Sequence, residues 1–87
     1  MNNIKEISKT ICKLTSDKSI CNFLLEILTK SEVETLSKRW QILKMLNEGK
    51  SQREIAKELQ VSLCKVTRGA RILKTKNSII RKIIKEN

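Results

Sequence analysis

The segment 63–74 carries a row of cationic and hydroxyl side chains that no carboxylate interrupts. The row consists of Lys65, Thr67, Arg68, Arg71 and Lys74. No acidic residue occurs anywhere between Leu59 and Lys85. A solvated helix face usually mixes both signs, because like charges three or four residues apart repel by a few tenths of a kcal/mol. The row therefore indicates a surface for a polyanion such as DNA, with a merely solvated basic helix as the alternative.

Two serines divide this region into a pair of short helices. Ser51 followed by Glu54 is a capping box, which predicts that a helix begins at Gln52. Ser62 is a second good N-cap, so the next helix begins at Leu63. Apolar residues recur at helical spacing on both sides of the break at 59–62, where the periodicity fails. Two short helices joined by a tight turn predict a helix-turn-helix at 51–74.

Length and charge limit the class of protein. The chain has 87 residues, enough for one domain but too few for a large core. Its net charge is +10, yet residues 1–36 hold five Lys and five acidic residues, so all of the excess lies after Leu36. A neutral first half and a basic second half predict a scaffold followed by a module that binds nucleic acid.

Several classes of chemistry lack the residues that they need. The three cysteines form no C-x-x-C pair and the chain has no His, so no disulfide framework, zinc site or other metal site is expected. Without His, Tyr, a glycine-rich phosphate loop or paired carboxylates, no catalytic residues are expected and the protein is not an enzyme. No signal peptide and no membrane span are seen, which predicts no membrane partner and a cytoplasmic protein, associated with a bacterial nucleoid.

The first half of the chain has more apolar surface than a small monomer can bury. Residues 4–14 form an apolar stripe, and 20–28 is apolar nearly all round. This predicts a homodimer formed through residues 1–48; a central core helix in a monomer is the alternative. Thr29 with Glu32 predicts the start of a longer helix that ends at Gly49, with Trp40 in its core-facing stripe.

The chain is expected to end in a basic amphipathic helix that begins within 75–77. Its apolar ridge is formed by Ile79, Ile80, Ile83 and Ile84. Packing of this ridge against a partner subunit is favoured over lying on a membrane. The whole prediction is a single all-α domain of six short helices: dimerisation helices at 1–48, the helix-turn-helix at 51–74 and a C-terminal helix at 75–87.

The run S-Q-R-E at 51–54 followed by T-R-G at 67–69 resembles the tryptophan repressor family. The resemblance covers about residues 20 to 75. It implies an intertwined helical homodimer that represses transcription by binding a pseudo-palindromic operator in double-stranded DNA when an amino-acid corepressor is bound. Gln60 departs from the family by standing where a glycine usually makes the turn.

The resemblance also implies site residues. The expected DNA contacts are the matched residues together with neighbouring cations: Lys50, Gln52, Arg53, Leu63, Cys64, Lys65, Thr67, Arg71 and Lys74. The expected ligand contacts are Thr29, Arg39, Arg68 and Gly69. The implied corepressor is L-tryptophan or a related indole. Because Lys65 replaces a threonine and Ile72 replaces the serine that would receive the ammonium group, an indole acid without that group is expected to bind at least as well.

Three alternatives to a regulated repressor remain open from the sequence. A ligand-independent repressor would use Arg39 and Arg68 for structure or phosphate contact. A nonspecific DNA-packaging protein would show no sequence preference. A basic dimeric adaptor that docks an acidic protein is less favoured, because docking surfaces usually expose aromatic residues and this chain has only Phe23 and Trp40.

Overall fold

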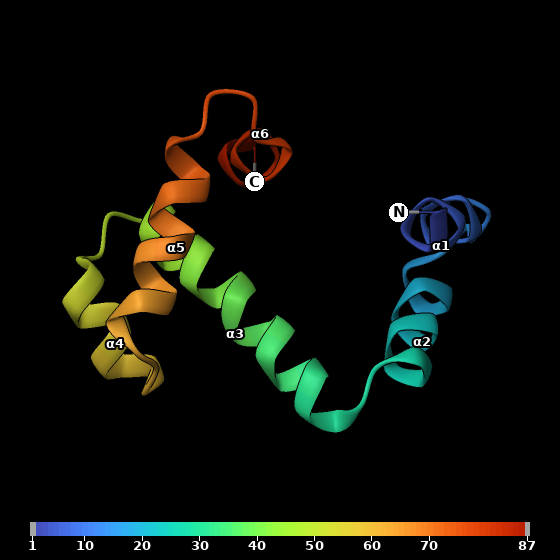
Figure 1. Ribbon diagram of the computed structural model, residues 1–87, viewed down its shortest axis with the longest axis horizontal. Coiled ribbons are helices and arrows are strands. Elements are labelled where there is room, and N and C mark those ends of the chain that lie inside the picture. The colour runs from blue at the N-terminus through green and yellow to red at the C-terminus, as the bar shows by residue number, and fades with distance from the viewer. Residues whose placement is uncertain (1, 87) are drawn as a thin grey trace. The chain divides into compact units, whose positions relative to one another are not determined.

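The structure, a computed structural model, describes residues 2–86 and is helical throughout (Figure 1). Its helices are α1 Asn2–Cys12, α2 Asp17–Ile27, α3 Lys30–Asn47, α4 Gln52–Leu59, α5 Leu63–Lys74 and α6 Ile79–Glu86. No strand occurs among residues 2–86. The expected all-α fold with six short helices is confirmed. The described chain forms two compact units, 2–34 and 35–86, whose boundary falls within α3.

The first unit leaves its apolar side chains partly uncovered. Ser16 starts α2, because its hydroxyl accepts the backbone N–H of Ser19 at 3.1 Å. No residue of α1 or α2 is fully buried, and Leu25 and Ile27 are each 54% exposed. A homodimer was predicted because a small monomer would leave apolar surface of this kind uncovered. Dimerisation itself stays a prediction.

Local hydrogen bonds set both ends of α3. The backbone N–H of Thr29 donates to the Glu32 carboxylate at 2.8 Å, and the N–H of Glu32 donates to the Thr29 hydroxyl at 3.1 Å. The bond from the Thr29 backbone, and then that with its side chain, hold the pKa of Glu32 below its ordinary value. At the other end Gly49 has φ +94°, and the N–H groups of Gly49 and Lys50 bond back to the last turn. Gly49 ends the helix as predicted.

The helix-turn-helix is held by two serine caps and one left-handed residue. The hydroxyls of Ser51 and Ser62 accept the N–H groups three residues ahead of them. Gln60 lies in the left-handed region at φ 54° and ψ 47°, as its place in the turn required. Its N–H donates to the end of α4, and the N–H of Val61 donates to the Ala56 carbonyl at 3.1 Å. These bonds offset the backbone strain, which costs roughly 1–2 kcal/mol for a residue with a side chain.

The core of the second unit lies where α3, α4 and α5 meet. It is formed by Ile42, Ile55 and Val66, which are all buried. At Gly69 α5 packs closely on α3, because a Cβ atom added there would lie 2.9 Å from Cγ2 of Ile42. The absent side chain is thus explained by a close helix crossing. Ile42 was not expected in the apolar stripe that contains Trp40. It is buried because other helices cover the second half of α3 on more than one side.

The last helix differs from expectation in two ways. It begins at Ile79 rather than within 75–77, because the Ser78 hydroxyl accepts the Arg81 N–H at 3.2 Å and caps it. Its ridge also splits. Ile84 is buried in its own chain, where the Asn47 side-chain amide donates to its carbonyl at 3.4 Å, whereas Ile79 is 70% exposed. Ile84 therefore packs within its own chain, and packing of the exposed part of the ridge on a partner subunit stays a prediction.

We expect Gly69→Ala to destabilise the fold although alanine favours helices. Contact with the stiff, β-branched Ile42 costs about 1–3 kcal/mol, while alanine returns about 1 kcal/mol of helix propensity. The free energy of unfolding in urea should fall by about 1 kcal/mol. Cys64→Ala, at an exposed position of the same helix, is the control and should change it little. A more stable Gly69→Ala protein would contradict the close crossing.

Candidate nucleic-acid interface and adjoining cavity

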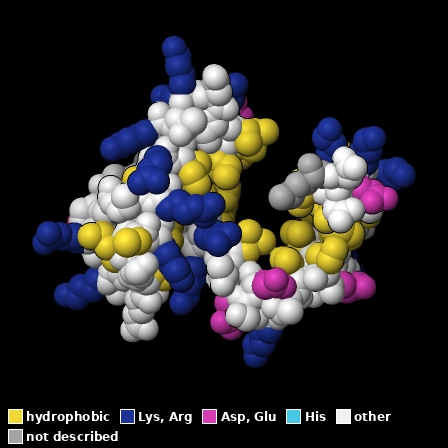
Figure 2. Space-filling view, viewed as in Figure 1, with side chains coloured by type: hydrophobic (Ala, Val, Ile, Leu, Met, Phe, Trp, Pro, Cys, Tyr) yellow, Lys and Arg dark blue, Asp and Glu magenta, His cyan; other side chains and the backbone are white. Residues whose placement is uncertain are grey.

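The outward surface of α5 is exposed and cationic. Lys65, Arg71 and Lys74 are exposed, and no ion pair neutralises them within residues 2–86. Leu63, 46% exposed, and Cys64 occupy the first turn of the same helix. In Figure 2, Lys and Arg side chains are spread over the visible surface of α4 and α5. This arrangement suits a DNA duplex, whose backbone binds cations while its groove accepts small apolar contacts with thymine methyl groups.

A hydrogen bond joins the two helices of the helix-turn-helix on this surface. The Thr67 hydroxyl donates to Oε1 of Gln52 at 2.8 Å, across fifteen residues of sequence. Both side chains are half-buried. The bond uses the hydroxyl proton, so Thr67 can only accept a further hydrogen bond, while the Gln52 amide NH₂ still donates. Two residues expected to contact DNA separately are thus one unit, and this pairing was not predicted from residue spacing.

The cations contributed by α4 and its preceding loop differ from each other. Arg53 is exposed in the first turn of α4 and has no ion pair among the described residues. Lys50 pairs with Glu58, with Nζ 3.1 Å from Oε2, and both side chains are well exposed. Such a surface pair contributes roughly 0–1 kcal/mol, so exchange of Glu58 for a phosphate costs Lys50 little.

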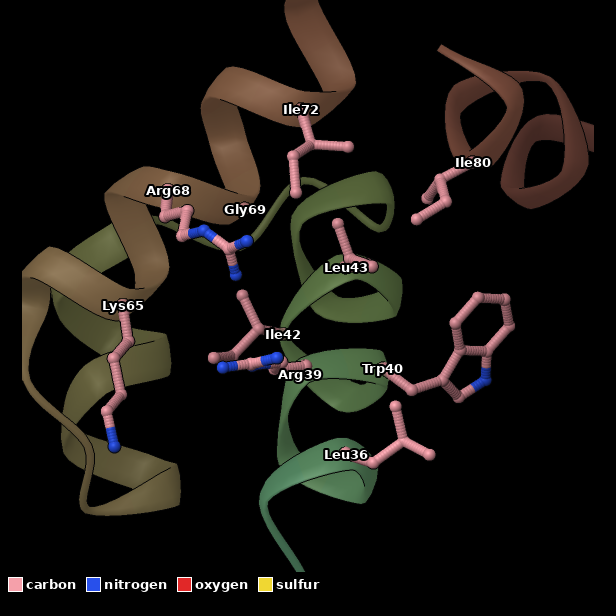
Figure 3. Close-up of a pocket in the computed structure, with 10 residues that line it drawn as sticks. All are labelled: Leu36, Arg39, Trp40, Ile42, Leu43, Lys65, Arg68, Gly69, Ile72 and Ile80. Atoms are coloured by element: carbon pink, nitrogen blue, oxygen red, sulfur yellow. The ribbon is translucent and has the colours of Figure 1, made fainter. Parts of the chain in front are cut away.

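A cavity of about 260 Å³ lies between α3, α5 and α6. Its lining residues are Leu36, Arg39, Trp40, Ile42, Leu43, Lys65, Arg68, Gly69, Ile72 and Ile80. Of the expected ligand contacts, it brings together Arg39, Arg68 and Gly69. Thr29 belongs to the other unit, where its hydroxyl caps α3. In Figure 3 the Arg39 and Arg68 guanidinium groups reach into the space between α3 and α5, on the side where Lys65 also lies.

Trp40 was expected in the core, and that expectation is wrong. Its side chain is 40% exposed and forms the apolar wall of the cavity with Ile80 and Leu36. Periodicity correctly places Trp40 on the apolar stripe of α3 but cannot show which part of the stripe other helices cover. Ile80 was missed because its position depends on the turn between α5 and α6.

Comparison with known proteins identifies the family. The family model described as Trp repressor protein matches residues 2–87. The chain belongs to the Trp repressor family. It is 44% identical over 70 residues to proteins named Trp operon repressor homolog from Xylella fastidiosa strains M23, Temecula1 and 9a5c. The match covers 79% of this chain and 76% of each relative. No solved structure matches the chain.

Membership in the Trp repressor family confirms the resemblance drawn from the S-Q-R-E and T-R-G motifs. The protein is accordingly a DNA-binding transcriptional repressor with a helix-turn-helix. The Trp repressor family is a family of regulators rather than enzymes. None of the helices within residues 2–86 is long and apolar enough to cross a membrane.

The bond between Gln52 and Thr67 predicts an energetic coupling between α4 and α5. Thr67→Val removes the hydroxyl at nearly constant shape, and Gln52→Ala removes its acceptor. We expect the two changes to be non-additive by about 0.5–1.5 kcal/mol in the free energy of unfolding, measured by urea denaturation of all four proteins of the cycle. Effects that add to within about 0.3 kcal/mol would show that the bond does not form in solution.

Proposed function

We propose that this protein is a homodimeric repressor that reads a pseudo-palindromic operator with α5 and responds to a small indole-like ligand in the cavity beside it. The observation that carries the proposal is the exposed, unneutralised cationic surface of α5, anchored to α4 by the Gln52–Thr67 bond. A surface of one sign supplies phosphate affinity, and a rigid helix with uncharged side chains in its first turn supplies base readout.

The proposed contacts divide into two groups. Gln52, Arg53, Lys50 and Lys74 hold phosphates, because they flank α5 or lie at its end and carry free donors. The first two turns of α5 face the floor of the major groove through Leu63, Cys64 and Thr67, whereas Lys65 borders the cavity. Arg71 lies one turn before Lys74 and is proposed to contact the DNA backbone as well.

A two-fold dimer would set the distance between the two DNA-binding units. Residues 1–48 are proposed to join two copies, residues 51–74 to bind DNA, and α6 to support α5 from behind. Helix-turn-helix dimers, of which the Trp repressor is an established example, bind half-sites whose centres lie roughly 34–36 Å apart. A repressor of this kind acts on the DNA of the bacterial cytoplasm.

The proposed ligand is an indole acid held between Arg39 and Arg68. Two guanidinium groups on facing helices can stack on a ring and pair with a carboxylate. L-tryptophan is the family's corepressor, but its ammonium group would face Ile72 and Lys65. An unpaired ammonium costs on the order of 1–3 kcal/mol, so indole-propionate should bind at least as well as L-tryptophan.

Two substitutions test the DNA interface. Lys74→Ala should weaken binding to all DNA sequences alike and reduce the slope of log affinity against log salt by about 1 per protomer. Thr67→Ala should cost roughly 1–3 kcal/mol on the preferred site and less on random DNA, where only its hold on the phosphate contact Gln52 is lost. Fluorescence anisotropy with both duplexes over a range of salt measures this. Equal losses on both duplexes for both variants would instead favour nonspecific packaging.

The oligomeric state has its own test. Sedimentation at low micromolar concentration should give twice the chain mass of 10.1 kDa, because the first unit leaves Leu25 and Ile27 uncovered. A matched variant, Leu25→Lys, should shift the equilibrium toward monomer, whereas Lys18→Ala at an exposed polar site of α2 should not. A wild-type monomer would remove the proposed dimer.

A further inference from the structure

The cavity beside α5 carries more positive charge than an amino acid can balance. Three of its lining residues are cations, Arg39 from α3 and Lys65 and Arg68 from α5. None of the three forms an ion pair within residues 2–86, and no Asp or Glu lines the cavity. A zwitterionic ligand adds one negative and one positive charge, so it leaves the total charge of the site unchanged.

The cations gather at one end of the cavity, and the other end is apolar. Figure 3 shows the Arg39 and Arg68 guanidinium groups on either side of Ile42, with Lys65 farther along α5, whereas Trp40 and Ile80 lie toward α6. No hydroxyl or carboxylate lines the cavity, so an ammonium group has no side-chain acceptor there. A ligand that satisfies both ends has an apolar body at one end and acidic groups at the other.

Two separate guanidinium groups can each hold a carboxylate. Arg39 and Arg68 come from different helices, and each can bind one carboxylate through two N–H groups, with Lys65 as a point charge beside them. The volume of about 260 Å³ exceeds the roughly 150 Å³ that accommodates benzene in an engineered cavity. One aromatic ring therefore fits, with its acidic groups at the rim.

We propose that this cavity selects an amphipathic dianion, a ring compound with two carboxylates at one end, in preference to an amino acid. The proposal rests on the proposed function in that the cavity is taken to be the regulatory site of the repressor. It replaces the indole acid, which has one carboxylate, by a dianion, so that Arg39 and Arg68 each bind a carboxylate and neither stacks on the ring. The third cation, Lys65, makes the second acidic group favourable and an ammonium group unfavourable.

Three probes that differ at a single carbon test the ligand class. Benzylmalonate, 3-phenylpropionate and phenylalanine carry a carboxylate, a hydrogen and an ammonium group, respectively, at the same position. At about pH 8 both carboxylates of benzylmalonate are ionised. Trp40 is the chain's single tryptophan and lines the cavity, so its fluorescence reports occupancy directly. Benzylmalonate should bind roughly fivefold or more tightly than phenylpropionate, and phenylalanine should bind weakest.

Matched variants connect the preference to the third cation. Lys65→Gln should reduce the affinity ratio of benzylmalonate to phenylpropionate toward one. Lys74→Gln removes a cation from the same helix outside the cavity and should leave the ratio unchanged. Both changes are at exposed positions, and helix content by circular dichroism verifies that each variant folds. A ratio that falls equally in both variants would reduce the effect to overall charge and overturn the proposal.

The remaining outcomes separate this proposal from the proposed function. Phenylalanine binding as tightly as benzylmalonate, or no binding of any probe by wild-type protein that still prefers one DNA sequence, would overturn the dianion proposal and leave the repressor intact. Wild-type protein that binds benzylmalonate but shows no sequence preference on DNA would support the cavity and contradict the proposed operator reading. Phenyl phosphate, with both charges on one group, should bind more weakly than benzylmalonate; tighter binding would overturn the choice of two carboxylates.

Discussion

The close crossing of α5 over α3 at Gly69 is the contact on which the second unit depends. Without a Cβ atom at this position, α5 approaches α3 until Ile42 and Leu46 fill the space. The same approach lets Val66 and Ile55 pack against Ile42, and this core holds α5 against α4. The helix proposed to face DNA is therefore fixed from behind by apolar contacts, which leaves its outward side free for charge.

One helix thereby serves two sites in the proposed repressor. Arg68 and Gly69 line the cavity. The neighbouring residue, Thr67, donates a hydrogen bond to Gln52 on the side proposed to face DNA. A ligand between Arg39 and Arg68 would add contacts between α3 and α5. Those contacts would influence the position of α5, the helix proposed to enter the major groove. A ligand can shift DNA affinity only by as much as it binds one arrangement of α5 better than another.

Local chemistry was predictable from the sequence, and distant packing was not. Ser51, Ser62 and Gly49 act within a few residues of themselves, so their helix boundaries follow from residue type and spacing. Trp40, Ile80 and Ile84 were misplaced or missed, because their surroundings depend on the angle at which α6 returns after 75–78. The cavity residues Arg39, Arg68 and Gly69 came from family resemblance rather than from spacing. The partnership of Gln52 with Thr67 needed the angle of the turn at Gln60, which a side-chain pattern does not specify.

In the proposed repressor, α5 is held by this crossing and reads a specific DNA sequence as one half of a dimer. Selection of preferred sites from random duplex DNA tests it most directly. We expect enrichment of a pseudo-palindrome whose half-site centres lie roughly 34–36 Å apart. A pool that is retained by the protein yet stays random in sequence after repeated selection would contradict it.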